Sequence, residues 1–324
     1  MNTTTIAVKQ PSPIKAIRSG VETVASHIYL ILFPIALDLY LLFGTRLTVS
    51  KPINDLLAQV QLPANAAQDL MVTWNGTLQM LKEYFTYFSL TSALRTLPFG
   101  IPSLLAGQAL TNNPLSRIKT TELTSSGQIS LWFVVFSLIG LLAATFYYKF
   151  CAMAVNKQAR KISFSQTFND FASNIALPML TIIFLAIVLL PGLLIIGILS
   201  AITPFLGTIG YLIVLSILIS IFLPLFFTPF ATALYGEGFL KSVLLSIQTF
   251  RPTGPATSIF IFLAISSTYL TNLLWQSAPD DSWMLLVGIF GHALITTILV
   301  ASSFHLFIEA ISNVRMAFQP VQPS

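Results

Sequence analysis

Charged residues are absent from one long apolar stretch, and this pattern predicts two membrane-spanning helices. Residues 171–236 contain no Asp, Glu, Lys or Arg. A helix of roughly 20 apolar residues crosses the hydrocarbon core of a bilayer, which is about 30 Å thick, so the stretch is long enough for two crossings. Polar residues and a proline at 200–204 indicate a tight turn between them. We therefore expect a helical hairpin at residues 175–230.

Four other apolar segments are also long enough to cross a membrane. Pro34 predicts a kink in the first of them. Tyr147, Tyr148 and Lys149, at the end of the second, are typical of an anchor at the membrane surface. The pattern therefore predicts an all-α, polytopic membrane bundle with about six transmembrane helices. The four segments cover residues 27–44, 130–150, 256–275 and 283–310.

Amphipathic segments are expected to connect these spans. The spacing of apolar residues predicts an interfacial helix within an inner N-terminal segment, residues 1–26, and amphipathic connectors at 151–174 and 231–255 on the same side of the membrane. The region 45–129 is expected to lie on the outer side, with amphipathic helices of its own that are partly embedded in the membrane surface. Residues 311–324 form a short polar inner tail.

Composition supports a membrane protein and excludes an ordinary soluble domain. Hydrophobic residues make up 55% of the sequence and charged residues only 8%, whereas about 25% are charged in a typical soluble domain. The formal net charge of +5 comes from scattered Lys and Arg, so no nucleic-acid partner is expected. The expected partners are the lipid bilayer and other membrane proteins.

The distribution of basic residues predicts an orientation in the membrane. The two short outer turns carry no Lys or Arg, whereas the inner segments, counting Lys149 at the inner end of the second span, carry all of the basic residues that lie outside 45–129. Positive charge is enriched on the cytoplasmic side of membrane proteins. We therefore expect both termini on the cytoplasmic side of a cell membrane, and a bacterial cytoplasmic membrane is the expected setting.

Two ionisable residues within the predicted spans are candidate functional groups. Asp38 lies in the first span and His292 in the last, at similar predicted depth. Ionisable groups inside a bilayer are costly to desolvate and often serve a function. Such a pair could relay a proton or an ion, with the carboxylate fixing the histidine tautomer. Alternatively, Asp38 reaches the outer interface and His292 hydrogen-bonds to a backbone carbonyl.

A second group of polar residues is predicted at the inner face. His305 and Glu309 are one helical turn apart, and His27 begins the first span on the same side. These residues lack the ligand spacing of a metal site, so we expect surface hydrogen bonds rather than a metal. The single Cys151 excludes an internal disulfide.

Motifs for catalysis are absent from the sequence. It contains no phosphate-binding Gly-rich loop with Lys, no nucleophile elbow and no His-Glu-x-x-His pair. We therefore expect no catalytic residues and no cofactor. The pattern favours a non-enzymatic membrane-organising or scaffold component. The alternative is a transporter or permease subunit that uses Asp38 and His292.

A motif in the second connector resembles a known class of membrane protein. Residues 235–242 read YGEGFLKS, and the motif is carried by Glu237, Gly238, Lys241 and the following Ser246. It resembles bacterial multi-pass families such as the membrane domain found beside glycerophosphodiester phosphodiesterases, in which a similar pattern on an inner interfacial helix leads into the next span. The resemblance covers roughly residues 130–310 and implies a helical bundle with amphipathic connectors. The phosphodiesterase catalytic domain has no counterpart here, so its activity is not implied.

The same stretch is also similar to the coupling loop of ABC importer permeases. That loop reads Glu-Ala-Ala, then Gly, then Ile-x-Leu-Pro. Here residues 232–234 read Thr-Ala-Leu in place of the acidic start, and Ile247 and Pro252 fall out of register. A permease of this kind would co-purify with an ATPase and stimulate ATP hydrolysis, which makes the alternative testable.

Overall fold

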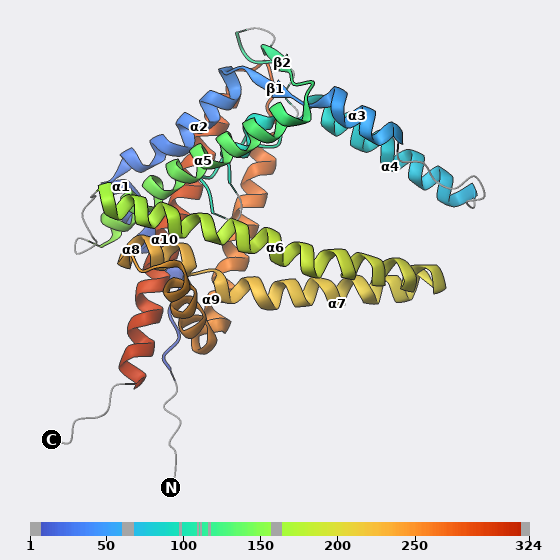
Figure 1. The fold of residues 1–324 in the computed structure, drawn as a ribbon. Helices are drawn as coiled ribbons and strands as arrows, with labels where there is room; N and C mark the ends of the chain where they lie inside the picture. The colour runs from blue at the N-terminus through green and yellow to red at the C-terminus, as the bar shows by residue number, and fades with distance from the viewer. Residues whose placement is uncertain are drawn as a thin grey trace, which may run out of the picture.

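The structure, a computed structural model, describes residues 8–59, 68–96, 99–108, 110, 112–115, 118–156 and 164–318. These residues form an almost entirely helical fold with one short pair of strands (Figure 1). The all-α prediction is therefore confirmed. The elements are α1 (Pro13–Ser26), η1 (Ile28–Ile31), α2 (Leu32–Phe43), β1 (Arg46–Thr48), α3 (Ser50–Gln59), α4 (Gln68–Tyr87), η2 (Leu90–Leu94), β2 (Thr120–Glu122), α5 (Ser126–Val155), α6 (Phe164–Ile202), α7 (Pro204–Phe222), η3 (Leu223–Leu225), α8 (Thr228–Tyr235), α9 (Phe239–Trp275) and α10 (Met284–Phe318).

Several helical segments are long and apolar enough to cross a membrane. A further candidate is formed by α1 and the helical segment Ile28–Phe43, which meet at an angle of 94°. The described residues thus hold five candidate spans, or six if this bent pair counts as one, and the prediction of a multi-pass helical membrane protein is confirmed. The five are Ser126–Val155, Ser165–Ser200, Pro204–Tyr235, Phe239–Trp275 and Met284–Ala317.

Local sequence explains where the helices begin and end. Thr203 caps α7 by accepting a hydrogen bond from the Leu206 amide at 3.3 Å, and Pro204 occupies the first turn of the helix. The predicted turn between the two apolar helices therefore lies where the sequence indicates. Gly236 ends α8 in the left-handed conformation, with φ of 62°, which glycine adopts without steric cost. The sharp bend after α1 lies at His27, whereas Pro34 is accommodated in the first turn of α2.

Two helices run through the boundaries that the sequence predicts between connectors and spans. α6 begins at Phe164, inside the predicted connector 151–174, and continues into the span as one helix of 39 residues. α9 likewise runs for 37 residues without interruption at Pro252 or Pro255. Each proline removes one backbone donor and bends a helix, but neighbouring hydrogen bonds and packing preserve the helix. The buried hydroxyl of Thr253 also donates to the Thr249 carbonyl at 2.6 Å.

α10 lies at the centre of the packed bundle. α1 runs alongside it, close enough that a side-chain carbon on Gly20 would collide with Ser302. Near the ends of the described chain, Asn313 donates to the Lys9 carbonyl at 3.0 Å. Buried aromatic side chains fill the space between α5, α8, α9 and α10. The largest of them are Tyr147, Phe227, Phe260, Phe304 and Phe307.

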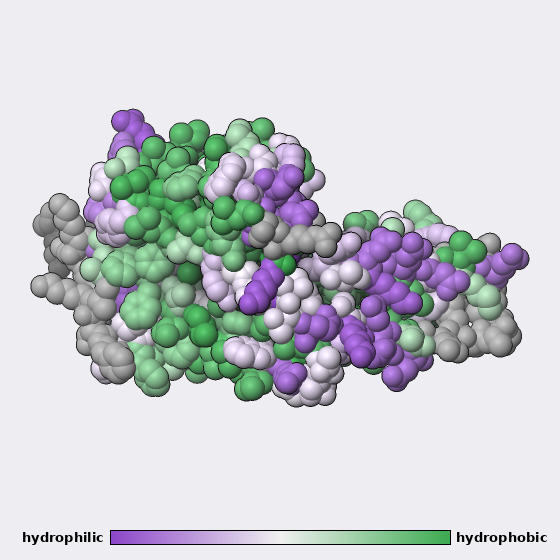
Figure 2. All heavy atoms as spheres, turned by 90° about the horizontal axis from the view of Figure 1, so that it is seen from above, coloured by the Kyte–Doolittle hydropathy of each residue, from purple (hydrophilic) through white to green (hydrophobic). Residues whose placement is uncertain are grey.

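Two arms extend from the bundle. The α6–α7 hairpin runs out to one side (Figure 1), and its side chains are mostly exposed and apolar, as at Leu194 and Phe205. Apolar residues on all faces are typical of helices surrounded by lipid. The second arm consists of α3 and α4, which lie on the same side of the bundle as the hairpin. Seen from above, hydrophilic residues gather over this arm while the bundle beside it is largely apolar (Figure 2).

A carboxylate joins the α3–α4 arm to the strand pair. β1 and β2 are parallel, and Glu122 at the end of β2 accepts hydrogen bonds from the Thr48 hydroxyl at 2.6 Å and the Lys51 amide at 2.7 Å. The Ser50 hydroxyl donates to the same carboxylate at 3.0 Å. Glu122 thereby caps the N-terminus of α3 with negative charge, which the helix dipole favours.

Candidate functional site

Asp38 holds a loop against α2. Its side chain is fully buried, and its carboxylate accepts hydrogen bonds from the Ser103 hydroxyl, the Leu104 amide at 2.9 Å and the Leu105 amide at 3.1 Å. A buried carboxylate is stable when hydrogen bonds replace its hydration. The structure therefore gives Asp38 a positioning role for residues 99–108.

His292 is also buried, but it bonds to a different element. Its Nδ1 lies 2.8 Å from Oδ1 of Asn272 on α9. Because Oδ1 is an acceptor, Nδ1 carries the ring proton in a neutral imidazole and Nε2 presents a lone pair. Nε2 is buried and has no hydrogen-bond partner among the described residues. Asp38 and His292 thus lie in the same part of the bundle without a hydrogen bond between them.

Arg95 is a charged residue that interacts electrostatically with both Asp38 and His292. It follows η2, and its guanidinium is close enough to interact with both Asp38 and His292. Arg95 is exposed on the protein surface. Partial desolvation by the neighbouring protein lowers the pKa of Arg95 and the Asp38 carboxylate raises it, and an exposed guanidinium keeps its charge. The Arg95 amide donates to the Ser92 carbonyl at 3.0 Å, but in the described part of the chain the guanidinium forms no hydrogen bond or ion pair. Sequence reasoning missed this residue, although a lone Arg before the apolar loop at 99–108 was a usable signal.

Arg95, Asn272 and His292 line a groove of about 470 Å³ beside α9 and α10. Most other lining residues are apolar or aromatic. Arg95 is the one charged residue among those that line the groove in the described chain. The polar residues that line the groove are Arg95, Thr96, Thr268, Asn272, His292, Thr296 and Ser303, together with Tyr148 and Tyr269.

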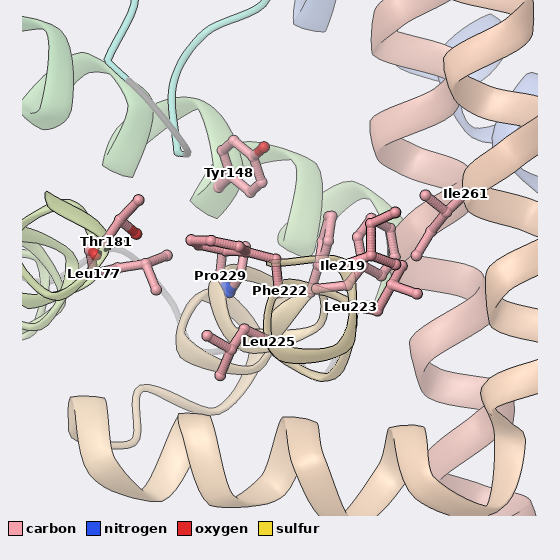
Figure 3. A pocket seen from close by; sticks show the side chains of 11 residues that line it. Tyr148, Leu177, Thr181, Ile219, Phe222, Leu223, Leu225, Pro229 and Ile261 are labelled. Carbon is pink, nitrogen blue, oxygen red and sulfur yellow. Dashed lines mark hydrogen bonds between the residues drawn. The ribbon is translucent and has the colours of Figure 1, made fainter. Parts of the chain in front are cut away.

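A second cavity of about 350 Å³ adjoins the groove at the base of the α6–α7 hairpin. Tyr148, Phe226 and Phe230 line both cavities. The remaining lining comes mainly from α6, α7 and η3 and is apolar apart from Thr181, as Figure 3 shows around Leu177 and Phe222. We call this second cavity the apolar chamber.

The predicted inner cluster lies at the contact between α1 and α10. His305 Nε2 is 2.8 Å from the Thr23 hydroxyl, and His27 Nδ1 is 3.1 Å from the Thr23 carbonyl. Glu309 instead forms an ion pair with Lys15 at 3.8 Å. The His305 and Glu309 contacts tie α1 to α10, whereas the His27 contact lies at the end of α1 itself. The described residues hold no group of three or more His, Cys, Asp or Glu placed to bind a metal ion.

The connector motif has two separate structural parts. Glu237 and Lys241 form an exposed ion pair at 3.2 Å, and Gly238 precedes the first turn of α9. Ser246 is buried, donates to the Pro224 carbonyl at 2.6 Å and accepts from the Phe227 amide at 3.0 Å. Ser246 therefore fastens α9 to the irregular segment that joins α7 to α8.

A buried ion pair replaces the predicted surface anchor at the end of the second span. The anchor prediction for Tyr147, Tyr148 and Lys149 is wrong, because all three side chains are buried. Lys149 Nζ lies 2.8 Å from Asp170 Oδ2, with exposed fractions of 2% and 5%. The sequence did not reveal this pair because Asp170 sits in a different predicted segment. Its role is to attach α6 to α5, aided by a hydrogen bond from Asn174 to Thr145 at 3.0 Å.

Comparison with known protein families, with characterised proteins and with solved structures gave no match. The resemblances drawn from residues 232–252 stay predictions.

Proposed function

We propose that this chain is a non-enzymatic membrane-organising protein that holds an anionic membrane component in the groove between α9 and α10. The observation that carries the proposal is the position of Arg95. Among the described residues it is the one charged side chain that lines the groove. Asp38 interacts with its guanidinium electrostatically but forms no ion pair or hydrogen bond with it. The nearby Asp38 carboxylate is directed to the 99–108 loop instead. A guanidinium in such a setting binds a phosphate or carboxylate through charge-assisted hydrogen bonds.

The roles of the other ionisable groups support binding rather than catalysis. Asp38 positions a loop, Lys149 pairs with Asp170, and Glu309 pairs with Lys15. A catalytic site needs an acid, base or nucleophile beside the reacting atoms. In this proposal the protein lies in a cell membrane with both ends on its cytoplasmic side. The hydrogen bond between Asn313 and Lys9 supports placing the two ends on the same side.

A transporter is the second candidate function, and the electrostatic proximity of Asp38, Arg95 and His292 favours it. Proton-coupled transport would use His292 while Asp38 keeps its loop in place. A His292→Gln variant in proteoliposomes separates the two functions. Loss of proton-coupled flux at an unchanged protein level would support the transporter and contradict the binding proposal. Absence of flux in the unaltered protein would support the binding proposal.

Native mass spectrometry of the delipidated full chain tests the proposed function. We expect phosphatidylglycerol to bind more tightly than phosphatidylcholine with the same acyl chains. Arg95→Gln should weaken phosphatidylglycerol binding by about tenfold to a hundredfold, since charge-assisted hydrogen bonds contribute about 1.5 to 3 kcal/mol. Arg251→Gln, an exposed arginine on α9 outside the groove, is the matched control. Equal binding of both lipids, or equal loss in both variants, would contradict the proposal.

A further inference from the structure

The groove is elongated along α10, with its polar groups concentrated toward one end. Because an α-helix rises about 1.5 Å per residue, His292 and Ser303 lie roughly 16 Å apart along the axis. Asn272 and Arg95 lie at the His292 end. A compact anion bound there would leave most of the groove unfilled.

The other end of the groove is aromatic and leads to the apolar chamber. Phe304 follows Ser303 on α10, and its ring lies 4.9 Å from that of Phe230 and 6.1 Å from that of Tyr148. These last two rings also line the apolar chamber. The chamber's Thr181 hydroxyl donates to the Leu177 carbonyl at 2.8 Å, so it adds little polarity. The groove therefore changes from polar to apolar along its length.

His292 adds a requirement at the polar end. Its buried Nε2 presents a lone pair without a donor in the described residues. A buried acceptor without a partner is destabilising, and a ligand hydroxyl that donates to it removes that cost. Arg95 supplies only donors, so it selects the anionic group of the ligand. The two side chains together match a headgroup that carries both a negative charge and a hydroxyl.

We propose that the ligand is an anionic phospholipid whose headgroup bears a hydroxyl. Its phosphodiester lies at Arg95, its hydroxyl donates to His292 Nε2, and one acyl chain follows the groove into the apolar chamber. The apolar chamber lies at the base of the α6–α7 hairpin, where Leu177, Ile219 and Phe222 line it (Figure 3). This inference rests on the proposed function, since it specifies the ligand of the same groove. Glycerol and inositol phospholipids share this headgroup chemistry.

The headgroup part of the inference is tested with two lipids that differ by their hydroxyl groups. Phosphatidylglycerol and phosphatidylmethanol carry the same phosphodiester charge, but the methyl headgroup has no hydroxyl. We expect the delipidated full chain to prefer phosphatidylglycerol about threefold to tenfold, the contribution of one hydrogen bond. His292→Leu should abolish this preference while retaining the preference for both anionic lipids over phosphatidylcholine. An unchanged ratio in His292→Leu would overturn the assignment of the hydroxyl.

The acyl-chain part is tested by filling the apolar chamber. Ile261 lines it, whereas Ile259 lies on the exposed face of the same helix. Ile261→Trp should weaken phosphatidylglycerol binding severalfold, and Ile259→Trp should not. Thr181→Phe fills the chamber from α6 and provides a second variant if Ile261→Trp does not fold. Binding of glycerophosphoglycerol, the deacylated lipid with the same phosphodiester and hydroxyls but no chains, should be unaffected by either chamber variant.

The possible failures of the two proposals are distinguishable. If Arg95→Gln weakens binding but chamber variants do not, the groove binds an anion and the lipid inference falls. If glycerophosphoglycerol binds as tightly as phosphatidylglycerol, the inference also falls while the proposed function stands. If the unaltered protein shows no preference for anionic lipids, the proposed function itself falls.

Discussion

Replacing Asp38 with alanine removes the acceptor that holds the loop at residues 99–108 against α2. The Ser103 hydroxyl and the Leu104 and Leu105 amides donate to its carboxylate. A buried donor left without an acceptor costs about 1 to 3 kcal/mol. Three such donors, with some access for water after the substitution, predict a loss of about 3 to 6 kcal/mol in the free energy of unfolding.

Reversible unfolding in mixed detergent micelles measures this loss, and hydrogen exchange locates it. The Leu104 and Leu105 amides should exchange much faster in Asp38→Ala. Asp55→Ala changes an exposed carboxylate on α3 and serves as the control, with an expected change within about 0.5 kcal/mol. A loss below about 1 kcal/mol in Asp38→Ala, or unchanged exchange at both amides, would refute the assigned role.

Three further predictions concern the supports of the bundle and its arms. Lys149→Met should lower the free energy of unfolding by about 3 to 5 kcal/mol, because it leaves Asp170 as a buried unpaired charge. The double variant with Asp170→Leu should recover most of that loss. Additive losses in unfolding measurements would contradict this. Desolvation raises the pKa of Glu122 but hydrogen bonds lower it more, so the net pKa lies below its ordinary value. The ionised Glu122 carboxylate therefore stabilises α3 fully above its ordinary pKa, and this stabilisation is lost as the pH falls through the lowered pKa of the folded protein. Glu122→Gln should remove this pH dependence, which amide exchange at the start of α3 measures. Gly140→Ala should destabilise α5, since the added carbon collides with the backbone of η2, whereas Gly197→Ala meets open space and should leave the unfolding midpoint unchanged or slightly raised.

The sequence predicts the helices better than it predicts their contacts. The charge-free stretch and the residues around Pro204 locate the α6–α7 hairpin, because apolar length and turn chemistry are local properties. Apolar length and turn chemistry do not predict that α9 continues through Pro252. That continuity depends on packing of α9 against α10, a tertiary contact that local sequence does not encode.

The candidate site was only partly predictable for the same reason. Asp38 and His292 stand out in the sequence because ionisable residues are rare within spans. Ser103, the partner of Asp38, is 65 residues away in the sequence, and Asn272, the partner of His292, lies on the preceding helix. Neither residue carries a sequence signal of its own. Arg95 could not be predicted as a binding residue, because the groove that it lines forms only when η2 packs against the bundle.

The most direct test of the central claim is an experimental structure of the full chain in nanodiscs that contain phosphatidylglycerol. The account predicts lipid density in the groove, with a phosphate oxygen within about 3 Å of the Arg95 guanidinium and an acyl chain running toward Phe230. A groove closed by side chains, or ordered anionic lipid only at other surfaces, would contradict it.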